Sequence, residues 1–458
     1  MSTVEDTIAA ISTPRGEAAL CVVRISGGES FDVLRRVFRR ARGKSIETMK
    51  PRVTYRGVIV RPRDGVEVDD VQAVRFEGPA SYTGEDAVEI YGHGGILVSE
   101  RVLGAVLDAG ARLAERGEFT MRAYLNGKID LMQAEAVLDV ITARNEKFLG
   151  MSVRNLQGSL SERMRGEMDR LVSLIAGIEV EIEYPDESYE VVSEVQVKTA
   201  AREAKERLEA LLRSYGSTRV IREGVKVALV GPPNVGKSSL MNRLLEKDRV
   251  IVTPVPGTTR DLVGDWLRMG GMDVLLMDTA GIAETEDVVE REGIRRTREF
   301  MNDADLVFFI LDASVPMNEG VREALGHVCG MGGVRIVVNK TDLPRALDAM
   351  ELEKLGAGVV MTSALTGDGV GDLRGIIRER VVERLEVDVE ASLANERQKR
   401  CVETAVEALD DVLVSEGVPV DVLAIDLRRA ASALGDMMGE GVTERVLEDI
   451  FTRFCVGK

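Results

Sequence analysis

A glycine-rich segment in the middle of the chain has the residue types and spacing that hold nucleotide phosphates. Residues 231–238 read GPPNVGKS and fit the pattern G-x-x-x-x-G-K-[ST], between the continuous apolar run 227–230 and the helix-forming segment 239–245. The glycines let backbone N–H groups close around phosphate oxygens at a helix N-terminus. Gly236 would provide this approach, Lys237 would reach the β- and γ-phosphates, and the Ser238 hydroxyl would ligate Mg²⁺. The segment therefore predicts a P-loop.

Three further motifs follow the P-loop in the order typical of guanine-nucleotide sites. Asp278-Thr279-Ala280-Gly281 ends the apolar run 274–277, where an aspartate can hold the Mg²⁺ water and a glycine N–H can sense the γ-phosphate. Asn339-Lys340-Thr341-Asp342 and Ser363-Ala364-Leu365 each follow a later apolar run. A carboxylate at Asp342 accepts hydrogen bonds from guanine N1–H and the exocyclic amine, which adenine does not provide. The motifs predict GTP rather than ATP, and we expect the nucleotide to contact Asn234, Val235, Gly236, Lys237, Ser238, Ser239, Thr253, Thr258, Thr259, Asp278, Thr279, Ala280, Gly281, Asn339, Lys340, Asp342, Ser363, Ala364 and Leu365.

Two features depart from a Ras-like site. Ile282 stands where Ras-like enzymes place the glutamine that orients the attacking water. Either GTP hydrolysis is slow, or an acidic residue downstream orients the water. The spacing does not decide which acidic residue would do so, or whether the acidic residues only solvate a loop. The second feature is Asn234 together with the loop 253–261, TPVPGTTRD, whose oxygens could coordinate a monovalent cation in the place of an arginine finger. The candidate acids are Glu284, Glu286, Glu290 and Glu292.

The elements that must position these residues form several domains. A chain of 458 residues with 45% hydrophobic residues suggests about three domains with large cores. Residues 1–120 predict a small α+β domain, and 133–183 and 195–212 predict long amphipathic helices, the second ending at Tyr215-Gly216-Ser217. From residue 226 continuous apolar strands alternate with helices, which indicates a mostly parallel sheet covered on both faces. We therefore predict a multidomain α/β and all-α fold with boundaries 1–120, 121–217 for the first part of a helical domain, 218–384 for an inserted P-loop GTPase domain, and 385–458 for the second helical part.

Composition excludes several classes of protein. The net charge of −17, from 60 basic and 77 acidic side chains, argues against a surface that coats nucleic acid. The stretch 35–63 is the exception, with eleven basic residues and one acidic residue, and it is either a docking patch for RNA or an acidic partner, or a solvated face. Four distant cysteines and two histidines make structural zinc and a disulfide framework improbable. The acidic N-terminus and the lack of a long apolar run predict a cytoplasmic protein without a membrane span.

Five segments outside the nucleotide motifs are more specific: GHGG at 92–95, GEFT at 117–120, LNGKIDL at 125–131, AEA at 134–136 and the terminal FCVGK at 454–458. With the GTPase motifs they make nearly the whole chain resemble the tRNA-modification GTPase family called MnmE or TrmE. Met121 and Val456 differ from the residues commonest in that family, and neither change removes chemistry. The alternative hypothesis is a regulatory or ribosome-assembly GTPase switch without modification chemistry.

The resemblance implies a homodimer and a potassium-activated GTPase. Its N-terminal domain would bind a formyl or methylene tetrahydrofolate. With an FAD-dependent partner, MnmG (GidA), in a heterotetrameric or larger complex, it would install a carboxymethylaminomethyl or aminomethyl group on C5 of the wobble uridine of tRNA.

The resemblance also implies roles for single residues. The potassium ligands would be Asn234, Thr253, Val255 and Thr258, and Thr259 would join Ser238 on Mg²⁺. A V-E-R-x-G-I pattern at 289–294 selects Glu290 as the catalytic glutamate, acting with Lys237. The folate site would comprise Arg24, Glu89, Lys128 and Lys458, and Cys455 would take part in the modification chemistry.

Overall fold

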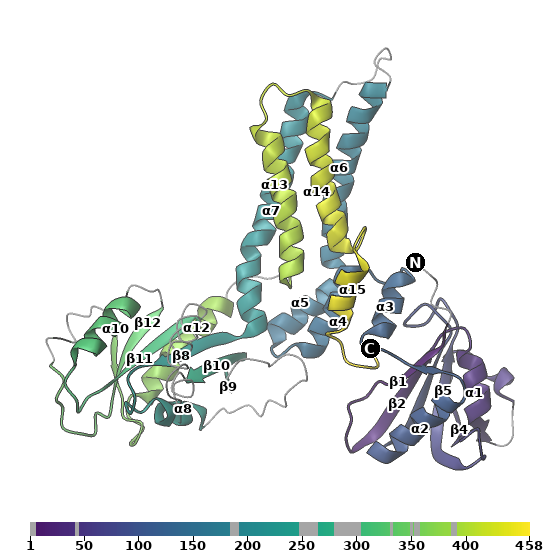
Figure 1. Cartoon of the computed structure of the whole chain (residues 1–458), viewed down its shortest axis with the longest axis horizontal. Coiled ribbons are helices and arrows are strands. Elements are labelled where there is room, and N and C mark those ends of the chain that lie inside the picture. Colours follow the sequence, from purple (N-terminus) through teal and green to yellow (C-terminus); the bar gives the residue numbers. More distant parts are fainter. Residues whose placement is uncertain are drawn as a thin grey trace, which may run out of the picture. The chain divides into compact units, whose positions relative to one another are not determined.

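The computed structural model of the chain describes residues 6–41, 45–183, 192–246, 264–278, 304–329, 333–348, 351, 358–385 and 392–458 (Figure 1). Contacts within the chain divide it into two compact units. One comprises Met1–Leu138, Asn155–Glu206 and Arg400–Lys458, and the other comprises Asp139–Arg154 and Arg207–Lys399.

The N-terminal part of the first unit is a seven-stranded sheet in the order β3-β4-β5-β6-β2-β1-β7. Neighbouring strands are antiparallel except β1 and β7, which are parallel. Helices α1 (Ser30–Val37) and α2 (Ile96–Asp108) pack on one face of this sheet (Figure 1). The strands are β1 (Ile8–Ile11), β2 (Ala18–Ser26), β3 (Phe38–Arg40), β4 (Tyr55–Val60), β5 (Glu67–Phe76), β6 (Ala87–Gly94) and β7 (Arg112–Leu113).

Alternation along the strands separates the apolar core of this domain from its polar residues. Val23 on β2 and Val88 on β6 belong to the core beneath the two helices. Because successive side chains of a strand point to opposite faces, Arg24 and Glu89 lie on the other face. There Phe119 of α3 packs with Ile8. The face away from α1 and α2 is therefore the one that carries Arg24 and Glu89, two of the four predicted folate residues.

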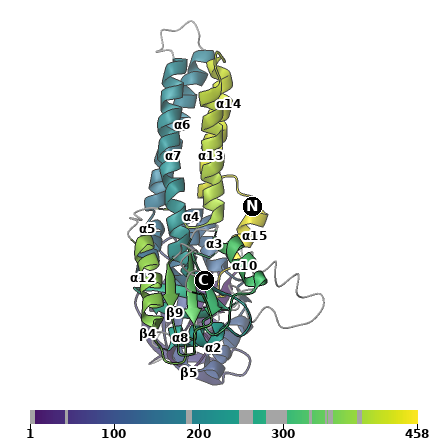
Figure 2. The same ribbon diagram turned by 90° about the vertical axis from the view of Figure 1, so that its left-hand side faces the viewer.

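Long helices make up most of the remainder of the first unit. Within it, α6 and α14 lie side by side (Figures 1 and 2), and Arg428 pairs with Glu179 between them. The helices outside the two sheets are α3 (Glu118–Leu125), α4 (Leu131–Thr142), α5 (Glu146–Leu156), α6 (Ser159–Glu183), α7 (Glu194–Glu223), α13 (Glu396–Val414), α14 (Val420–Met438) and α15 (Glu444–Phe451), with a short 3₁₀ turn at Ile46–Thr48.

One predicted helix boundary was wrong. Helix α7 continues through Tyr215-Gly216-Ser217 to Glu223. An internal glycine costs a helix only about 1 kcal/mol, and burial of Leu208, Leu211 and Ile221 along α7 outweighs that cost. Helix α15 ends at Phe451, and the tail beyond it turns at residues 452–454 before Val456 bridges to Arg116.

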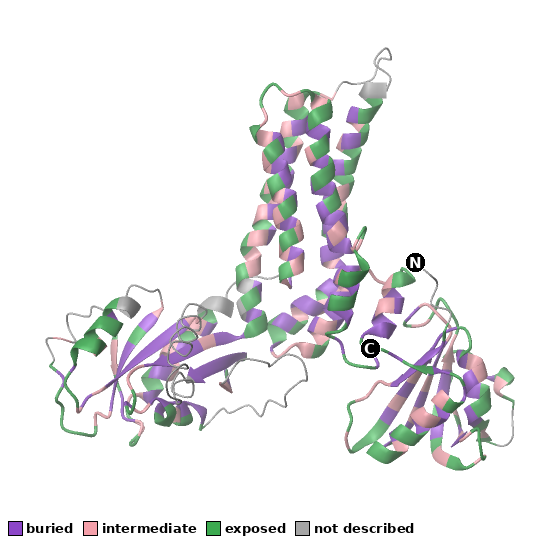
Figure 3. Cartoon of the chain, viewed as in Figure 1, coloured by how far each residue is buried: buried purple, intermediate pink, exposed green. Residues whose placement is uncertain are grey.

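The second unit contains a six-stranded sheet in the order β13-β12-β11-β8-β10-β9, parallel except for the edge strand β9. Apolar side chains cover both of its faces, and Figure 3 shows its strands as mostly buried. The strands are β8 (Val225–Val230), β9 (Asp265–Met269), β10 (Met272–Asp278), β11 (Leu306–Asp312), β12 (Val334–Asn339) and β13 (Val359–Met361), and the helices of the sheet domain are α8 (Lys237–Leu245), α10 (Glu319–Cys329) and α12 (Val370–Leu385).

These elements confirm the predicted fold class of a small N-terminal α+β domain, a helical domain and a P-loop domain with a mostly parallel sheet. In a parallel sheet the carboxyl ends of the strands meet at one edge, where ligands bind. The P-loop follows β8, and the other predicted nucleotide motifs follow β10, β12 and β13. No helix in the described ranges is long and apolar enough to span a bilayer.

Candidate functional site

The P-loop backbone requires glycine at its two ends. A Cβ on Gly231 would lie 2.3 Å from the Ile310 carbonyl oxygen, and a Cβ on Gly236 would lie 2.4 Å from Asn339 Nδ2. Gly236 has φ +92° and stands at the N-cap of α8. Asn234 also has a left-handed backbone, with φ +63°, and its side chain is exposed. These conformations turn the chain tightly enough for α8 to begin at the loop, with its first N–H groups directed toward a bound anion.

Lys237 lies against the same loop. Its Nζ donates hydrogen bonds to the carbonyl oxygens of Gly231, at 2.9 Å, and Pro232, at 2.8 Å. The side chain is buried, with 5% of the residue exposed. The structure therefore holds a positive charge within the P-loop, the location that phosphate binding requires.

Asn339 connects the P-loop to the base-recognition motifs. Its side chain is 1% exposed, Nδ2 donates to the Val235 carbonyl at 2.8 Å, and Oδ1 accepts from the Ala364 N–H at 3.0 Å. Ser363 Oγ donates to Asp342 Oδ1 at 2.5 Å. The structure thus brings the P-loop together with two predicted motifs that lie more than 100 residues later in the chain.

Asp312 is a residue of this site that sequence reasoning missed. It ends β11, and its Oδ2 pairs at 2.6 Å with Nζ of Lys340, whose backbone is left-handed with φ +64°. Burial opposes ionisation of Asp312, but the hydrogen bonds from Lys340 and Ser314 outweigh it and lower its pKa. Its position at the end of an apolar strand beside the β12 motif was the available signal.

Several predicted site residues lie outside the described residues: Thr253, Val255, Thr258, Thr259, Thr279, Ala280, Gly281 and Glu290. Asp278 is the last residue of β10, so its backbone stands at the carboxyl edge of the sheet. Ser238 and Ser239 occupy the first turn of α8 and are exposed.

In the first unit, Arg24 and Glu89 face each other in register across β2 and β6. Arg24 donates from Nε, at 3.0 Å, and from Nη2, at 2.8 Å, to Glu89 Oε1. Tyr91 donates to the other carboxylate oxygen at 2.6 Å, and burial followed by this bond raises the Tyr91 pKa to about 12. The guanidinium carbon lies 5.0 Å from the ring centre of Tyr82 and 5.7 Å from that of Phe119. Sequence reasoning missed the three aromatic residues, although Tyr91 follows Glu89 at the two-residue period of one strand face.

One guanidinium nitrogen of Arg24 has no hydrogen-bond acceptor among the described residues. Among the described residues, Nη1 of Arg24 is buried and has no hydrogen-bond partner. A buried donor without a partner costs about 1–3 kcal/mol. The arrangement of a guanidinium N–H without an acceptor, a carboxylate and the exposed ring of Tyr82 therefore suits a flat ligand with acceptor and donor groups.

The C-terminal tail is bound beside this pair. Arg116 Nε donates to the Phe454 carbonyl at 2.8 Å, Ser12 Oγ to the Gly457 carbonyl at 3.0 Å, and the Phe119 N–H to the Lys458 carbonyl at 3.2 Å. Lys458 is half-buried, and burial, with the nearby charge of Arg24, lowers its pKa.

The structure therefore brings Arg24, Glu89 and Lys458 together. Lys128 makes a separate contact, with its Nζ donating to the Pro79 carbonyl at 2.8 Å. Cys455 is exposed on the same tail.

The basic stretch 35–63 is engaged largely within its own domain. Three of its arginines pair with aspartates, and three others donate to backbone carbonyl oxygens. The first group is Arg35, Arg56 and Arg61, and the second is Arg36, Arg40 and Arg52. These contacts favour the interpretation as a solvated face over an RNA-docking patch.

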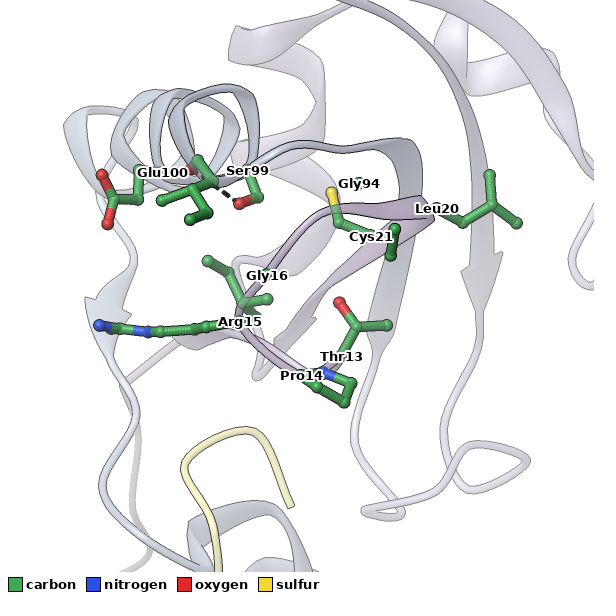
Figure 4. A pocket seen from close by; sticks show the side chains of 12 residues that line it. Thr13, Pro14, Arg15, Gly16, Leu20, Cys21, Gly94, Ser99 and Glu100 are labelled. Atoms are coloured by element: carbon green, nitrogen blue, oxygen red, sulfur yellow. Dashed lines mark hydrogen bonds between the residues drawn. The ribbon is translucent and has the colours of Figure 1, made fainter. Parts of the chain in front are cut away.

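A pocket in the N-terminal domain lies apart from the predicted residues. Its lining includes Thr13, Arg15, Cys21 and Ser99 (Figure 4), and none of the predicted site residues belongs to it. Cys21 is 3% exposed, and burial raises the pKa of its thiol. The pocket therefore presents a protonated thiol rather than a reactive thiolate.

Comparison with known proteins gives matches over nearly the whole chain. The family described as "GTP-binding protein TrmE N-terminus" matches residues 7–128, and "MnmE helical domain" matches residues 131–455. The tRNA modification GTPase MnmE of Geobacter metallireducens is 43% identical over 99% of this chain and 100% of its own length. The chain belongs to the MnmE family of tRNA modification GTPases. The MnmE of Geobacillus thermodenitrificans is 40% identical over 99% of both chains. Among solved structures, the G domain of the T. maritima FeoB iron transporter is 31% identical over 34% of this MnmE-family chain and 98% of its own, with a TM-score of 0.27.

Proposed function

We propose that this MnmE-family chain hydrolyses GTP with the help of a potassium ion and couples hydrolysis to modification of C5 of the wobble uridine in tRNA. The observation that carries the proposal is the network through Asn339, which joins the P-loop at Val235 to the base-recognition loop at Ala364. Such a network holds the phosphate-binding and guanine-binding elements at a fixed spacing. We propose GTP, Mg²⁺ and K⁺ as the ligands of this unit.

Asn234 is the proposed potassium ligand for which the structure offers support. Its left-handed backbone and exposed side chain leave its amide oxygen available beside the phosphate loop. A cation there would stabilise charge on the transferring phosphoryl group. Thr253, Val255 and Thr258 would complete its shell, Ser238 and Thr259 would hold Mg²⁺, and Glu290 would orient the attacking water.

The N-terminal domain is proposed to bind a one-carbon tetrahydrofolate. The unpartnered Arg24 N–H and the Glu89 carboxylate fit the acceptor and donor edges of a pterin, and the exposed ring of Tyr82 fits one of its flat faces. The folate would supply the one-carbon unit, while Lys458 and Lys128 would add positive charge for its carboxylates. Cys455 is proposed to act in the modification chemistry from the adjoining tail.

The proposed assembly is a homodimer working with the FAD-dependent protein MnmG. The net charge of −17 and the internal pairing of the basic stretch support a division of labour in which the partner makes most of the contact with tRNA.

The decisive experiment is GTP hydrolysis by the full-length protein in KCl and in NaCl at equal ionic strength, for the parent and for Glu290→Ala. We expect strong stimulation by potassium that is lost in the variant. Equal slow rates in both salts would contradict the cation mechanism and favour a GTP-binding switch that needs an external activator. Nucleoside analysis of tRNA from cells lacking the gene tests the modification step, because unchanged carboxymethylaminomethyl-type uridines would refute it.

A further inference from the structure

We propose that Arg243 is a positioning residue that sets the guanine selectivity of the nucleotide site. Arg243 lies on α8, the helix that begins at the P-loop with Lys237. Its side chain reaches the segment 363–369, here called the base loop, which follows β13 and carries Ser363 and Ala364. The inference rests on guanine-nucleotide binding by this site.

Arg243 donates hydrogen bonds to two successive carbonyl groups of the base loop. Nε donates to the Ala364 carbonyl oxygen at 2.9 Å, and Nη2 donates to the Leu365 carbonyl oxygen at 2.7 Å. Nη1 pairs with Glu246, the C-cap residue of α8. A guanidinium is planar and presents its donors in a fixed fork, so two bonds to consecutive carbonyls define the position of the loop as well as its distance from α8.

The held loop in turn orients Asp342. Ser363 Oγ donates to Asp342 Oδ1, at 2.5 Å, and accepts from the Thr366 N–H, at 3.1 Å. The Ser363 N–H and carbonyl are both bonded inside the base loop, to Asp368 and Gly367. The position of the Ser363 hydroxyl, and with it that of the Asp342 carboxylate, therefore depends on the position of the base loop, which Arg243 holds.

This chain of contacts predicts an effect on one part of the base. The Asp342 carboxylate recognises the exocyclic 2-amine of guanine, which inosine nucleotides lack. Releasing the base loop would misplace the carboxylate and weaken GDP binding more than IDP binding. A role confined to stability would lower the melting temperature and leave the ratio of the two affinities unchanged.

The test measures dissociation constants of GDP and IDP with the full-length parent, Arg243→Ala and Arg243→Lys. We expect the preference for GDP over IDP to fall about tenfold in Arg243→Ala, which corresponds to about 1.4 kcal/mol. Arg243→Lys keeps one charged donor and should restore part of the preference. Arg322→Ala is the matched control, because that arginine pairs with Glu351 instead and should leave the ratio at the parent value.

The outcomes separate this proposal from the nucleotide assignment itself. A parental ratio in Arg243→Ala, with folding verified by circular dichroism, would overturn the positioning role. If Arg243→Ala does not fold, the ratio in Arg243→Lys decides, and a parental ratio there overturns the role as well. A parent protein that binds neither GDP nor IDP would instead refute guanine-nucleotide binding.

Discussion

The docking of the C-terminal tail depends on one glycine. Gly457 has φ +97°, and a Cβ there would lie 2.4 Å from the Ile11 carbonyl oxygen. That oxygen is backbone at the end of β1, so no side-chain rotation relieves the contact. We predict that Gly457→Ala releases the tail from the N-terminal domain while leaving the nucleotide unit intact.

The size of the effect follows from two terms. A left-handed backbone costs a residue with a Cβ about 1–2 kcal/mol, and losing the bond from Ser12 Oγ to the Gly457 carbonyl costs about 0.5–1.5 kcal/mol. Together they amount to about 1.5–3.5 kcal/mol, which reduces the ratio of docked to released tail roughly 10- to 300-fold. The Phe119 N–H, which donates to the Lys458 carbonyl in the first turn of α3, would then lose its partner.

Hydrogen exchange followed by mass spectrometry reports this release directly. In Gly457→Ala, amide exchange in the peptide covering 117–119 should accelerate, and folate affinity should fall by a similar factor while GTP hydrolysis stays at the parental rate. Gly417→Ala is the matched control, because Gly417 also has a positive φ, +67°, but nothing lies within 4 Å of its Cβ position. Parental protection of 117–119 in Gly457→Ala would refute the reasoning.

Three further predictions concern other parts of the chain. The protonated His93 ring donates a hydrogen bond to the Asp69 carboxylate, which raises the His93 pKa above its ordinary value of 6.5. This pair therefore stabilises the fold below about pH 6.5, and the contribution is lost as the pH rises through the raised pKa. Asp69→Asn should lower the His93 pKa in an NMR titration, and an unchanged value would contradict this. Trp266 is the sole tryptophan and lies on the edge strand β9, so its fluorescence emission should differ between the GDP and GDP–fluoroaluminate states. Identical spectra would show that β9 does not respond to the nucleotide state. Iodoacetamide should label the exposed Cys455 at least tenfold faster than the buried Cys21, as peptide mass spectrometry would show, and early labelling of Cys21 would mean that its pocket opens.

The nucleotide unit is the part that sequence predicted best. The P-loop, the strands and the order of motifs are local patterns, because each motif directly follows a continuous apolar strand. The Gly216 error shows the limit of such patterns. Burial of Leu211 and Ile221 outweighed the local helix breaker, and Ile221 belongs to a core that also contains Phe148, more than 70 positions earlier.

The contacts that connect motifs required the tertiary structure. The spacing of residues in the sequence did not predict the ion pair between Asp312 and Lys340 or the hydrogen bonds from Arg243 to the base loop. These partners depend on the order of the strands in the sheet. The same holds for Arg24 and Glu89, whose pairing follows from the register of β2 and β6.

The sequence by itself determined the class of nucleotide site, since residue types and short spacings dictate which groups can hold phosphate and guanine. The tertiary structure decided which of those groups meet. It placed the last residues of the chain beside Arg24, more than 400 positions earlier, through contacts such as the bond from Ser12 to Gly457. Strand register and tail docking are long-range properties set by packing over the whole domain, so no local pattern encodes them.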